Sequence, residues 1–486
     1  MSSSSNNIDN DVEVPEITTE AESISEPESF QSAPDPWDTK DSEFRSSLRR
    51  KIISFAWPCV AELFLVSLIA MVSLIMVGHL GAYAITAVGI TNQPVLISVA
   101  VFQAFNVGAT ALVARFIGAK EYSNAKTVVI QALAVSIFTG TLMCITGVYF
   151  AKSIVVAMGA QEDTVAYAEL YLKYMSVGII FQAIPTAVSS LLRGAGDTKS
   201  PMRYNIASNI INVVFGYPLI YGFWFIPGFG VEGAAIASTL AKISACAMSI
   251  YIICTSKLPI AVTLKDKFRL DFSMLKRIMN IGIGAAGEQL VLRVGLILFT
   301  KMVADLGTVY FAAHQIGINI NSLSFNFGQA LGMAATSFTG RSLGAKKPEM
   351  AENYCREIRR MGMVISIFIS ASFLFFGAGI ARLYTPDAAV IVNVVIILRI
   401  LALIIPAQNS QIIIAGGLRG AGDTRWTLIS TFCGVFFVRV ILAFFLIKVL
   451  MLGLVGAWIA VGLDQLVRST VIYLRFRNGK WKLLRV

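Results

Sequence analysis

A heptapeptide of identical sequence occurs twice in the chain. Leu-Arg-Gly-Ala-Gly-Asp-Thr stands at Leu192–Thr198 and again, 226 residues later, at Leu418–Thr424. The same offset relates two copies of an Arg-x-x-Gly-Ala-Lys motif, which begin at Arg115 and at Arg341. Landmarks that repeat at one offset indicate that the chain is built twice from one plan, and this restricts every later fold assignment. We therefore expect two halves of similar structure.

The composition places this repeat in a membrane. Of the 486 residues, 56% are hydrophobic and 14% are charged, and the mean hydropathy is +0.70. A soluble protein has roughly 25% charged residues, so the chain is predicted to be a polytopic membrane protein. Its six cysteines lie in or beside apolar runs without a CxxC pair, which favours small core residues over ligands or disulfides. No phosphate-binding or zinc-ligand spacing occurs, so we expect no enzyme activity, no metal and no cofactor.

The first 44 residues differ from the rest of the chain. They hold 12 of the 29 acidic residues and one lysine, with much Ser, Glu and Pro and almost no apolar periodicity. Such a segment cannot bury enough apolar surface to offset its chain entropy. Residues 1–44 are therefore predicted to form a disordered acidic cytoplasmic tail, and they lack the basic start and apolar core of a signal peptide.

Twelve apolar segments are long enough for the roughly 20 residues that a spanning helix needs. They are 52–77, 87–114, 126–150, 165–190, 203–224, 230–255, 277–303, 311–339, 359–381, 389–416, 427–447 and 451–474. Six lie in a predicted N-terminal lobe at 45–256 and six in a C-terminal lobe at 277–486, joined by a cytoplasmic linker at 257–276. The predicted fold class is an all-α polytopic membrane protein, with twelve transmembrane helices in two parallel six-helix repeats. Substrate sites of such proteins typically lie between the repeats.

Lys and Arg residues set the predicted orientation. If both termini and every even-numbered loop are cytoplasmic, those regions hold 30 of the 40 basic residues. The positive-inside rule then places both termini in the cytoplasm, and cytoplasmic loops that face anionic headgroups explain the basic excess without nucleic acid. We expect a monomeric, multi-pass protein of the plasma (inner) membrane.

Three acidic residues lie inside the predicted spans, namely Glu62, Glu288 and Asp464. An ionisable group in a span is a functional-site hypothesis by default, because its desolvation is costly. Asp464 has Arg468 four residues later, which suits an intrahelical ion pair. Glu62 and Glu288 match across the repeat, have no basic residue four positions away, and are predicted to lie opposite each other across the central axis. They are predicted to exchange a proton or hold a cation, and the alternative is a protonated glutamate that bonds a neighbouring helix.

Amide side chains form stripes on several predicted helices. In the eighth span Gln315, Asn319 and Asn326 share one face. Lipid penalises such groups, so they are expected to face protein or water. Interhelical hydrogen bonding explains any single amide equally well, but the whole set predicts a wet central cavity. The cavity-lining candidates are Gln93, Gln103, Gln182, Asn205, Asn209, Asn212, His314, Gln315, Asn319, Asn326, Gln329 and Gln408.

The heptapeptide itself is interpreted as a turn. It is Gly-rich, but no Lys-Ser/Thr follows it and no β-strand precedes it, so a phosphate loop is disfavoured. We predict a helix C-cap in which glycine takes the left-handed turn and Asp caps the next helix. Arg193 and Arg419 are then expected to anchor at the cytoplasmic headgroups. His314 has no metal partner in the sequence and favours a packing role.

Three motifs together resemble the multidrug and toxic compound extrusion (MATE) transporters. They are Val77-Gly78-His79-Leu80-Gly81, Ala312-Ala313-His314-Gln315-Ile316 and the two heptapeptide loops. The resemblance covers about 53–480 and implies two six-helix bundles with a V-shaped cavity, which export cationic or amphipathic organic compounds against inward Na⁺ or H⁺. Many members have an Asp at the position of Ser73, and some have an acid at that of Gln408. These departures make Glu62 and Glu288 the better candidates for ion and substrate coupling here.

Three functions compete on this basis. The first is a secondary active antiporter, in which H⁺ or Na⁺ competes with small cationic organic substrates for the two glutamates. The second is a flippase for a lipid-linked precursor, which would need a more basic cavity and has some support from Arg293 and Lys242. The third is a channel or receptor. Two matched acids and twelve spans favour the antiporter, with small organic substrates and membrane lipids as its partners.

Overall fold

The computed structural model describes residues 42–80, 82–158, 162–222, 227–256, 258–262 and 271–484. The predicted acidic tail lies outside the described residues except for its last three positions, and part of the predicted linker, at 257 and 263–270, also lies outside them. The described residues belong to one compact unit.

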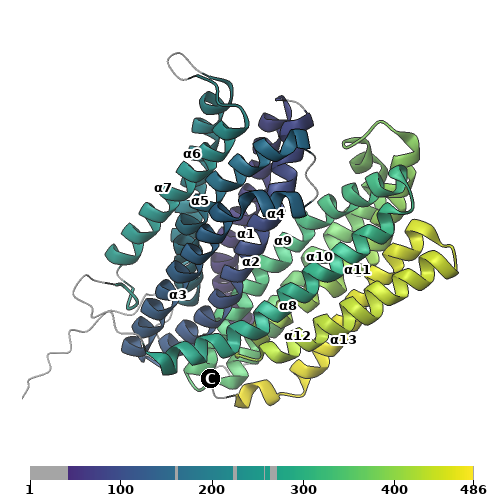
Figure 1. Ribbon diagram of the computed structural model, residues 1–486. Helices are drawn as coiled ribbons and strands as arrows, with labels where there is room; N and C mark the ends of the chain where they lie inside the picture. Colours follow the sequence, from purple (N-terminus) through teal and green to yellow (C-terminus); the bar gives the residue numbers. More distant parts are fainter. Residues whose placement is uncertain are drawn as a thin grey trace, which may run out of the picture. The chain divides into compact units, whose positions relative to one another are not determined.

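Regular structure in the described part of the chain is helical, as predicted. The first half consists of α1 (Ser42–Gly78), α2 (Ala82–Gly118), α3 (Tyr122–Tyr149), α4 (Ala151–Ala157), α5 (Glu162–Gly194), α6 (Lys199–Tyr221) and α7 (Val231–Thr255). The second half consists of α8 (Phe272–Ala304), α9 (Thr308–Gly344), α10 (Pro348–Arg382), α11 (Ala388–Gly420), α12 (Thr424–Phe432), the π-helical segments η2 (Cys433–Leu442) and η3 (Phe445–Val449), α13 (Gly453–Arg477) and the short η4 (Lys480–Leu483). Each predicted span coincides with one of these helices, and α12, η2 and η3 together cover the eleventh. The two halves form adjacent groups of helices, purple to teal and green to yellow in Figure 1.

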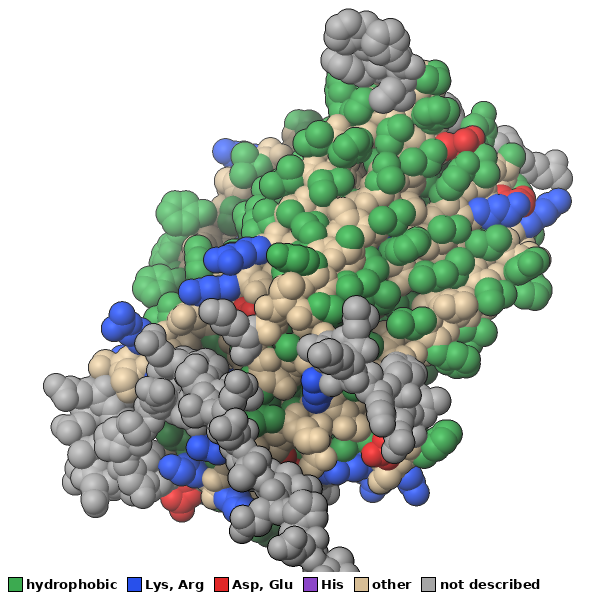
Figure 2. Space-filling model, turned by 90° about the vertical axis from the view of Figure 1, so that its left-hand side faces the viewer, with side chains coloured by type: hydrophobic (Ala, Val, Ile, Leu, Met, Phe, Trp, Pro, Cys, Tyr) green, Lys and Arg blue, Asp and Glu red, His purple; other side chains and the backbone are tan. Residues whose placement is uncertain are grey.

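The outer surface of these helices is suited to lipid. Among the described helices, ten are long and apolar enough to cross a membrane. The other two predicted spans form α6 and α9, which carry many of the predicted amide residues. Large side chains such as Phe138, Phe368 and Phe375 are exposed. Figure 2 shows hydrophobic side chains over most of the middle and upper part of one face, with Lys and Arg most frequent toward its lower end. Apolar surface of this extent marks contact with a membrane or a partner.

Both copies of the heptapeptide form the same turn. Gly196 and Gly422 each have a φ of +87°, a left-handed conformation that glycine adopts without strain. The backbone N–H that follows each glycine donates to the carbonyl oxygen five residues earlier, at 2.8 Å in both copies. This is the 6→1 bond of a Schellman motif. The predicted helix C-cap is therefore confirmed in both halves.

The predicted Asp cap is confirmed in one copy only. Asp197 Oδ1 accepts hydrogen bonds from the backbone N–H groups of Lys199 and Ser200, both at 3.0 Å, and so caps α6. Asp423 makes no such cap at α12. Its carboxylate instead accepts a hydrogen bond of 2.8 Å from Arg475 Nε in α13. A charge-assisted bond to arginine replaces the cap in the second half.

The halves also share their internal helix packing. Thr110 Oγ1 in α2 donates to the carbonyl oxygen of Ser190 in α5, at 3.1 Å. The matching Thr336 Oγ1 in α9 donates to the carbonyl oxygen of Gly416 in α11, at 2.9 Å. One threonine therefore joins the same two helices in each half, which confirms the duplication at the level of contacts.

The halves meet where α2 and α9 end in the Arg-x-x-Gly-Ala-Lys motif. A Cβ atom added to Gly118 would lie 2.0 Å from the carbonyl oxygen of Arg341, and one added to Gly344 would lie 1.9 Å from that of Arg115. Each helix end therefore packs on the backbone of its repeat-related partner at a distance that only glycine permits. Arg341 Nε also donates to the carbonyl oxygen of Gly194 in the first heptapeptide, at 3.1 Å. We call this contact the joint between the halves.

Replacing Gly344 by Ala should loosen the joint, because the new methyl group would overlap the Arg115 carbonyl oxygen and the helix ends must separate. Pulsed EPR between spin labels on the ends of α2 and α9 should then show a longer or broader distance distribution. Gly379→Ala in α10 is the matched control, because its Cβ meets no atom within 4 Å. Identical distributions for Gly344→Ala and the control would contradict the close packing described for the joint.

Candidate functional site

Glu62 in the first half is bound by two other helices. Arg193 Nη2, at the end of α5, donates to Glu62 Oε1 at 2.6 Å, and Asn205 Nδ2 in α6 donates to the same oxygen at 2.7 Å. The glutamate and arginine side chains are 7% and 14% exposed. This buried ion pair joins α1 to the turn between α5 and α6.

Glu288 makes the equivalent pair in the second half. Arg419 Nη2, at the end of α11, donates to Glu288 Oε1 at 2.5 Å. The two side chains are 3% and 19% exposed. The paired residues are 131 positions apart in both halves, so the duplication preserved the pair and not only its two members.

These pairs correct one expectation from the sequence. Arg193 and Arg419 were predicted to anchor at the headgroups, and this is wrong because each binds the glutamate of its own half. The placement of the two glutamates opposite each other across the central axis stays a prediction. A buried carboxylate without a counter-charge is very unfavourable. The signal was present in the sequence, since the arginines repeat at the same offset as the glutamates.

The two pairs differ in their second contact. Glu62 Oε2 is buried and has no hydrogen-bond partner among the described residues. In the second half, Thr431 stands at the position of Asn205, and its hydroxyl oxygen is likewise buried without a partner in the described chain. Glu62 thus has two donors on one oxygen and none on the other, whereas Glu288 lacks the amide donor.

A second ionic cluster lies inside the second half. Arg439 Nη2, in the π-helical segment η2, lies 2.6 Å from Asp464 Oδ2 in α13. The predicted partner Arg468 is 4.0 Å from the same oxygen, and its Nη2 donates to Gln411 Oε1 at 3.2 Å. The predicted ion pair is therefore present but is not the shortest contact of Asp464. Sequence spacing missed Arg439 because it belongs to another helix.

The first half has no acid at the matching place. Ser238 stands at the position of Asp464, and Lys242 at that of Arg468. Lys242 Nζ lies 3.9 Å from Met175 Sδ and contacts no acidic side chain in the described residues. Asn212, a cavity candidate, bridges Ser238 at 3.2 Å and Ser73 at 3.4 Å. The first half therefore keeps one basic residue of this cluster, Lys242, and has serine in place of the acid.

The amide candidates fall into different environments. Asn326 Nδ2 in α9 donates to Ser67 Oγ in α1 at 3.0 Å, a bond between the halves. Asn319 Nδ2 donates to the carbonyl oxygen of Gln315 on its own helix. Exposed side chains are Gln93, Gln103, Gln315 and Asn319, and half-buried ones are Gln182, Asn205, Asn209, Asn212, Asn326 and Gln329.

His314 and Gln408 do not lie on an open surface. They are 1% and 2% exposed, so they do not line a cavity in this conformation. The His314 ring packs between Phe299 and Trp458, with ring centroids 5.5 Å away in both cases. His314 is therefore surrounded by aromatic rings, which agrees with the packing role expected for it. Helix packing covers both side chains here, and their role as cavity-lining residues stays a prediction.

A comparison with family models matches each half separately. The MatE model matches residues 58–218 and again residues 285–445. The first match contains Glu62 and Arg193, and the second contains Glu288 and Arg419. Two matches of one model agree with the duplication found from the heptapeptide.

Similar proteins and structures extend over nearly the whole chain. A Thermotoga maritima protein with the name "Probable multidrug resistance protein NorM" is 28% identical over 442 residues, which cover 90% of this chain and 93% of the relative. The "Uncharacterized transporter YisQ" of Bacillus subtilis is 23% identical, with 91% of this chain and 98% of the relative covered. A solved MOP superfamily transporter from Pyrococcus furiosus is similar at a TM-score of 0.84 and 23% identity, covering 90% of this chain and 97% of that one. A mutant of the Vibrio cholerae MATE transporter VcmN gives 0.85 at 19% identity, covering 91% and 100%. The likeness to these structures shows the fold.

Breaking one ion pair should destabilise the protein more than removing it entirely. Glu62→Gln leaves Arg193 buried without a counter-charge, which typically costs about 3–5 kcal/mol. The double variant Glu62→Gln/Arg193→Met should recover part of that loss, and the thermal unfolding midpoint of the purified protein in detergent measures both. Glu169→Gln is the control, since its partner Lys173 is 41% exposed and such pairs contribute little. Strictly additive losses in the double variant would show that the pair does not act as a unit.

Proposed function

The chain belongs to the MatE family and is a multi-pass integral membrane protein, and we propose that it is an antiporter exporting cationic or amphipathic organic compounds in exchange for H⁺ or Na⁺. The name of the Thermotoga maritima relative, a multidrug resistance protein, supports efflux of small organic compounds. We further propose that both termini are cytoplasmic and that the monomer is the working unit, because two homologous halves within one chain supply the repeat interface.

The observation that carries this proposal is the free oxygen of Glu62. Arg193 and Asn205 both donate to Oε1, whereas Oε2 is buried without a donor among the described residues. A buried oxygen with no donor is costly, and a proton or a small cation at Oε2 would remove that cost. Glu62 is therefore the proposed binding point of the coupling ion in the first half.

Ion binding at Glu62 would affect the contact between the halves. Neutralising the carboxylate weakens its attraction for Arg193. The carbonyl oxygen of Arg193 accepts a hydrogen bond of 2.9 Å from Ser337 in α9, and Arg341 binds the next carbonyl oxygen along the chain. The state of the Glu62–Arg193 pair is therefore linked to the joint. Such a link lets an ion favour one conformation over the other, and exchange requires only this differential binding.

Glu288 would perform the corresponding step in the second half. Its carboxylate has Arg419 but no amide donor, so a cationic substrate competes there with one hydrogen-bond donor instead of with the arginine and the asparagine that bind Glu62. We propose that Glu62 binds the coupling ion and that Glu288 takes part in holding the substrate. The exposed amides Gln93, Gln103 and Gln315 offer neutral donors and acceptors that suit varied organic compounds.

Removing the carboxylates should abolish export. Glu62→Gln and Glu288→Gln are each expected to reduce export of a cationic dye from cells to background, because the neutral amide can neither release a proton nor hold a cation. The double variant Glu62→Gln/Arg193→Met separates folding from transport, since it should regain stability without regaining export. Glu169→Gln serves as the control and should export normally. Full export by a Glu62→Gln/Glu288→Gln protein would refute the assignment.

The coupling ion is testable by reconstitution. Purified protein in liposomes loaded with a cationic dye should move the dye when an inward gradient of the coupling ion is imposed. Na⁺ and pH gradients are applied separately, and the gradient that supports transport in the parent protein should fail in Glu62→Gln. Equal dye movement with no gradient would argue for a channel and against an antiporter.

A lipid-linked precursor is the second candidate substrate. Arg293 in α8 and Lys242 in α7 contact no acidic side chain among the described residues, so either could meet a diphosphate. Lys242, however, packs against Met175 and Gly178 between α5 and α7, which makes it a weaker candidate. Flipping of a labelled lipid by purified protein without ion-driven dye transport would favour this function over the antiporter.

A further inference from the structure

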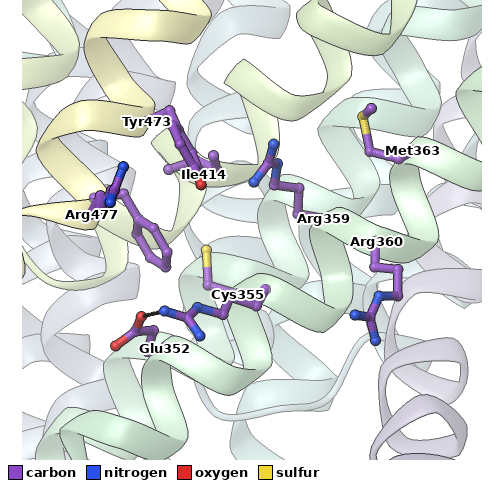
Figure 3. Close-up of a pocket in the computed structure, with 10 residues that line it drawn as sticks. Glu352, Cys355, Arg359, Arg360, Met363, Ile414, Tyr473 and Arg477 are labelled. Carbon is purple, nitrogen blue, oxygen red and sulfur yellow. Dashed lines mark ion pairs between the residues drawn. The ribbon is translucent and has the colours of Figure 1, made fainter.

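A basic pocket lies in the second half, and none of the four residues of the glutamate pairs lines it. Its volume is about 400 Å³, and it is lined by α10, α11 and α13. Figure 3 shows Arg359 and Arg360 from α10 and Arg477 from α13 around it, with Glu352 at its edge. Arg356 is a fourth arginine in the lining. Four guanidinium groups line the pocket, and two of them, those of Arg356 and Arg360, are paired with Glu352 and Glu357.

The acidic side chains near the pocket already pair with two of its arginines and with basic residues outside it. Glu352 pairs with Arg356 and with Lys482. Glu357, outside the lining, accepts from Arg49 of α1 at 2.6 Å and from Arg360 at 3.2 Å. No acid in the described part of the chain is left to neutralise the remaining arginines. An anion entering the pocket would therefore meet uncompensated positive charge.

Two arginines are placed to bind an anion. Arg359 is fixed by a hydrogen bond of 2.9 Å from its Nε to Ser410 Oγ and by stacking over the Tyr473 ring, 4.5 Å from the centroid. Its two terminal nitrogens make no hydrogen bond to the described residues. Arg477 has neither an ion pair nor a hydrogen bond within the described chain. A preorganised guanidinium with free terminal nitrogens suits bidentate binding of phosphate oxygens.

The lining also contains uncharged residues. Cys355, Met363 and Ile414 are among them. Further along α10, Ile367 and Phe368 are exposed, on the surface expected to meet acyl chains. The arginines near the start of α10 are therefore followed along the same helix by exposed apolar side chains, a sequence typical of helices that pass from the headgroup region into the acyl chains.

The fold alone does not require this charge. At the offset of 226 residues, the positions of Arg356, Arg359, Arg360 and Arg477 are Ile130, Leu133, Ala134 and Tyr251 in the first half. The same helices therefore exist in the first half without any of the four arginines. The positive charge is an addition to the second half alone.

We propose that this pocket binds a phosphate group, with Arg359 and Arg477 as its main ligands. The shared chemistry is that of an anionic phosphate, which either an acidic phospholipid of the inner leaflet or free phosphate in the cytoplasm supplies. The uncharged lining residues and the exposed apolar side chains along α10 favour the lipid. Neither Glu62 nor Glu288 lines the pocket, and the inference rests on the proposed cytoplasmic orientation of the termini but not on the proposed transport mechanism.

The test uses the full-length protein in detergent and native mass spectrometry. Short-chain phosphatidylglycerol, short-chain phosphatidylcholine and inorganic phosphate are titrated separately. We expect phosphatidylglycerol to bind, and Arg477→Gln to weaken it by about tenfold, since a hydrogen bond to a charged group contributes about 1.5–3 kcal/mol. Arg359→Gln should weaken binding at least as much. Arg382→Gln, an exposed arginine at the other end of α10, is the matched control and should bind normally.

The possible outcomes distinguish a phospholipid from free phosphate as the ligand, and one of them would overturn the proposal. Phosphatidylglycerol binding that depends on Arg477, with no competition from inorganic phosphate, supports the lipid. Inorganic phosphate that binds equally well and competes supports a soluble anion at the same site. Binding of both phospholipids that is unchanged in Arg477→Gln would overturn the proposal. Arg477 makes no bond to the described residues, so its replacement is expected to leave folding intact, and the unfolding midpoint checks this.

Discussion

The counter-charge that a buried carboxylate requires organises both halves of this protein. Burial removes a charge from water, so an isolated buried charge is far less stable than a paired one. Glu62 and Glu288 each take an arginine from the end of the fourth predicted span of their half. The same arginines stand beside the glycine turns that start the next helices. One ion pair therefore fixes the first helix of each half against the turn that leads into the fifth predicted span.

The duplication preserved some contacts and changed others. The glycine turns, the threonine–carbonyl bonds and the glutamate–arginine pairs are present in both halves. The second half adds Asp464 with Arg439 and Arg468, together with the π-helical segments that carry Arg439. The first half has Ser238 and Lys242 at the positions of Asp464 and Arg468. Inserted π turns often accompany functional sites in helices. The shared contacts hold each bundle together, whereas the differences give the two halves different sets of buried charged residues.

Predictions based on local signals were the accurate ones. Each of the twelve predicted apolar segments is helical in the structure. A spanning helix satisfies its own backbone hydrogen bonds within one stretch of sequence, so it can be recognised from that stretch alone. The left-handed glycine of each heptapeptide was also predicted, because the turn depends on a few neighbouring residues. Contacts with distant residues overturned the other predictions. Arg193 and Arg419 were assigned to the headgroups but bind Glu62 and Glu288. Asp423 was expected to cap the helix that follows it but binds Arg475 instead.

The sequence by itself determined that the chain is duplicated, which segments form helices and which charged residues match across the repeat. These features follow from composition, periodicity and a fixed offset, all of which are properties of the linear chain. Only the tertiary structure decided which partner each charge takes, where the halves touch and which polar residues are covered. Glu62 and Arg193 lie 131 positions apart, and helix packing, not sequence spacing, brings their side chains to 2.6 Å.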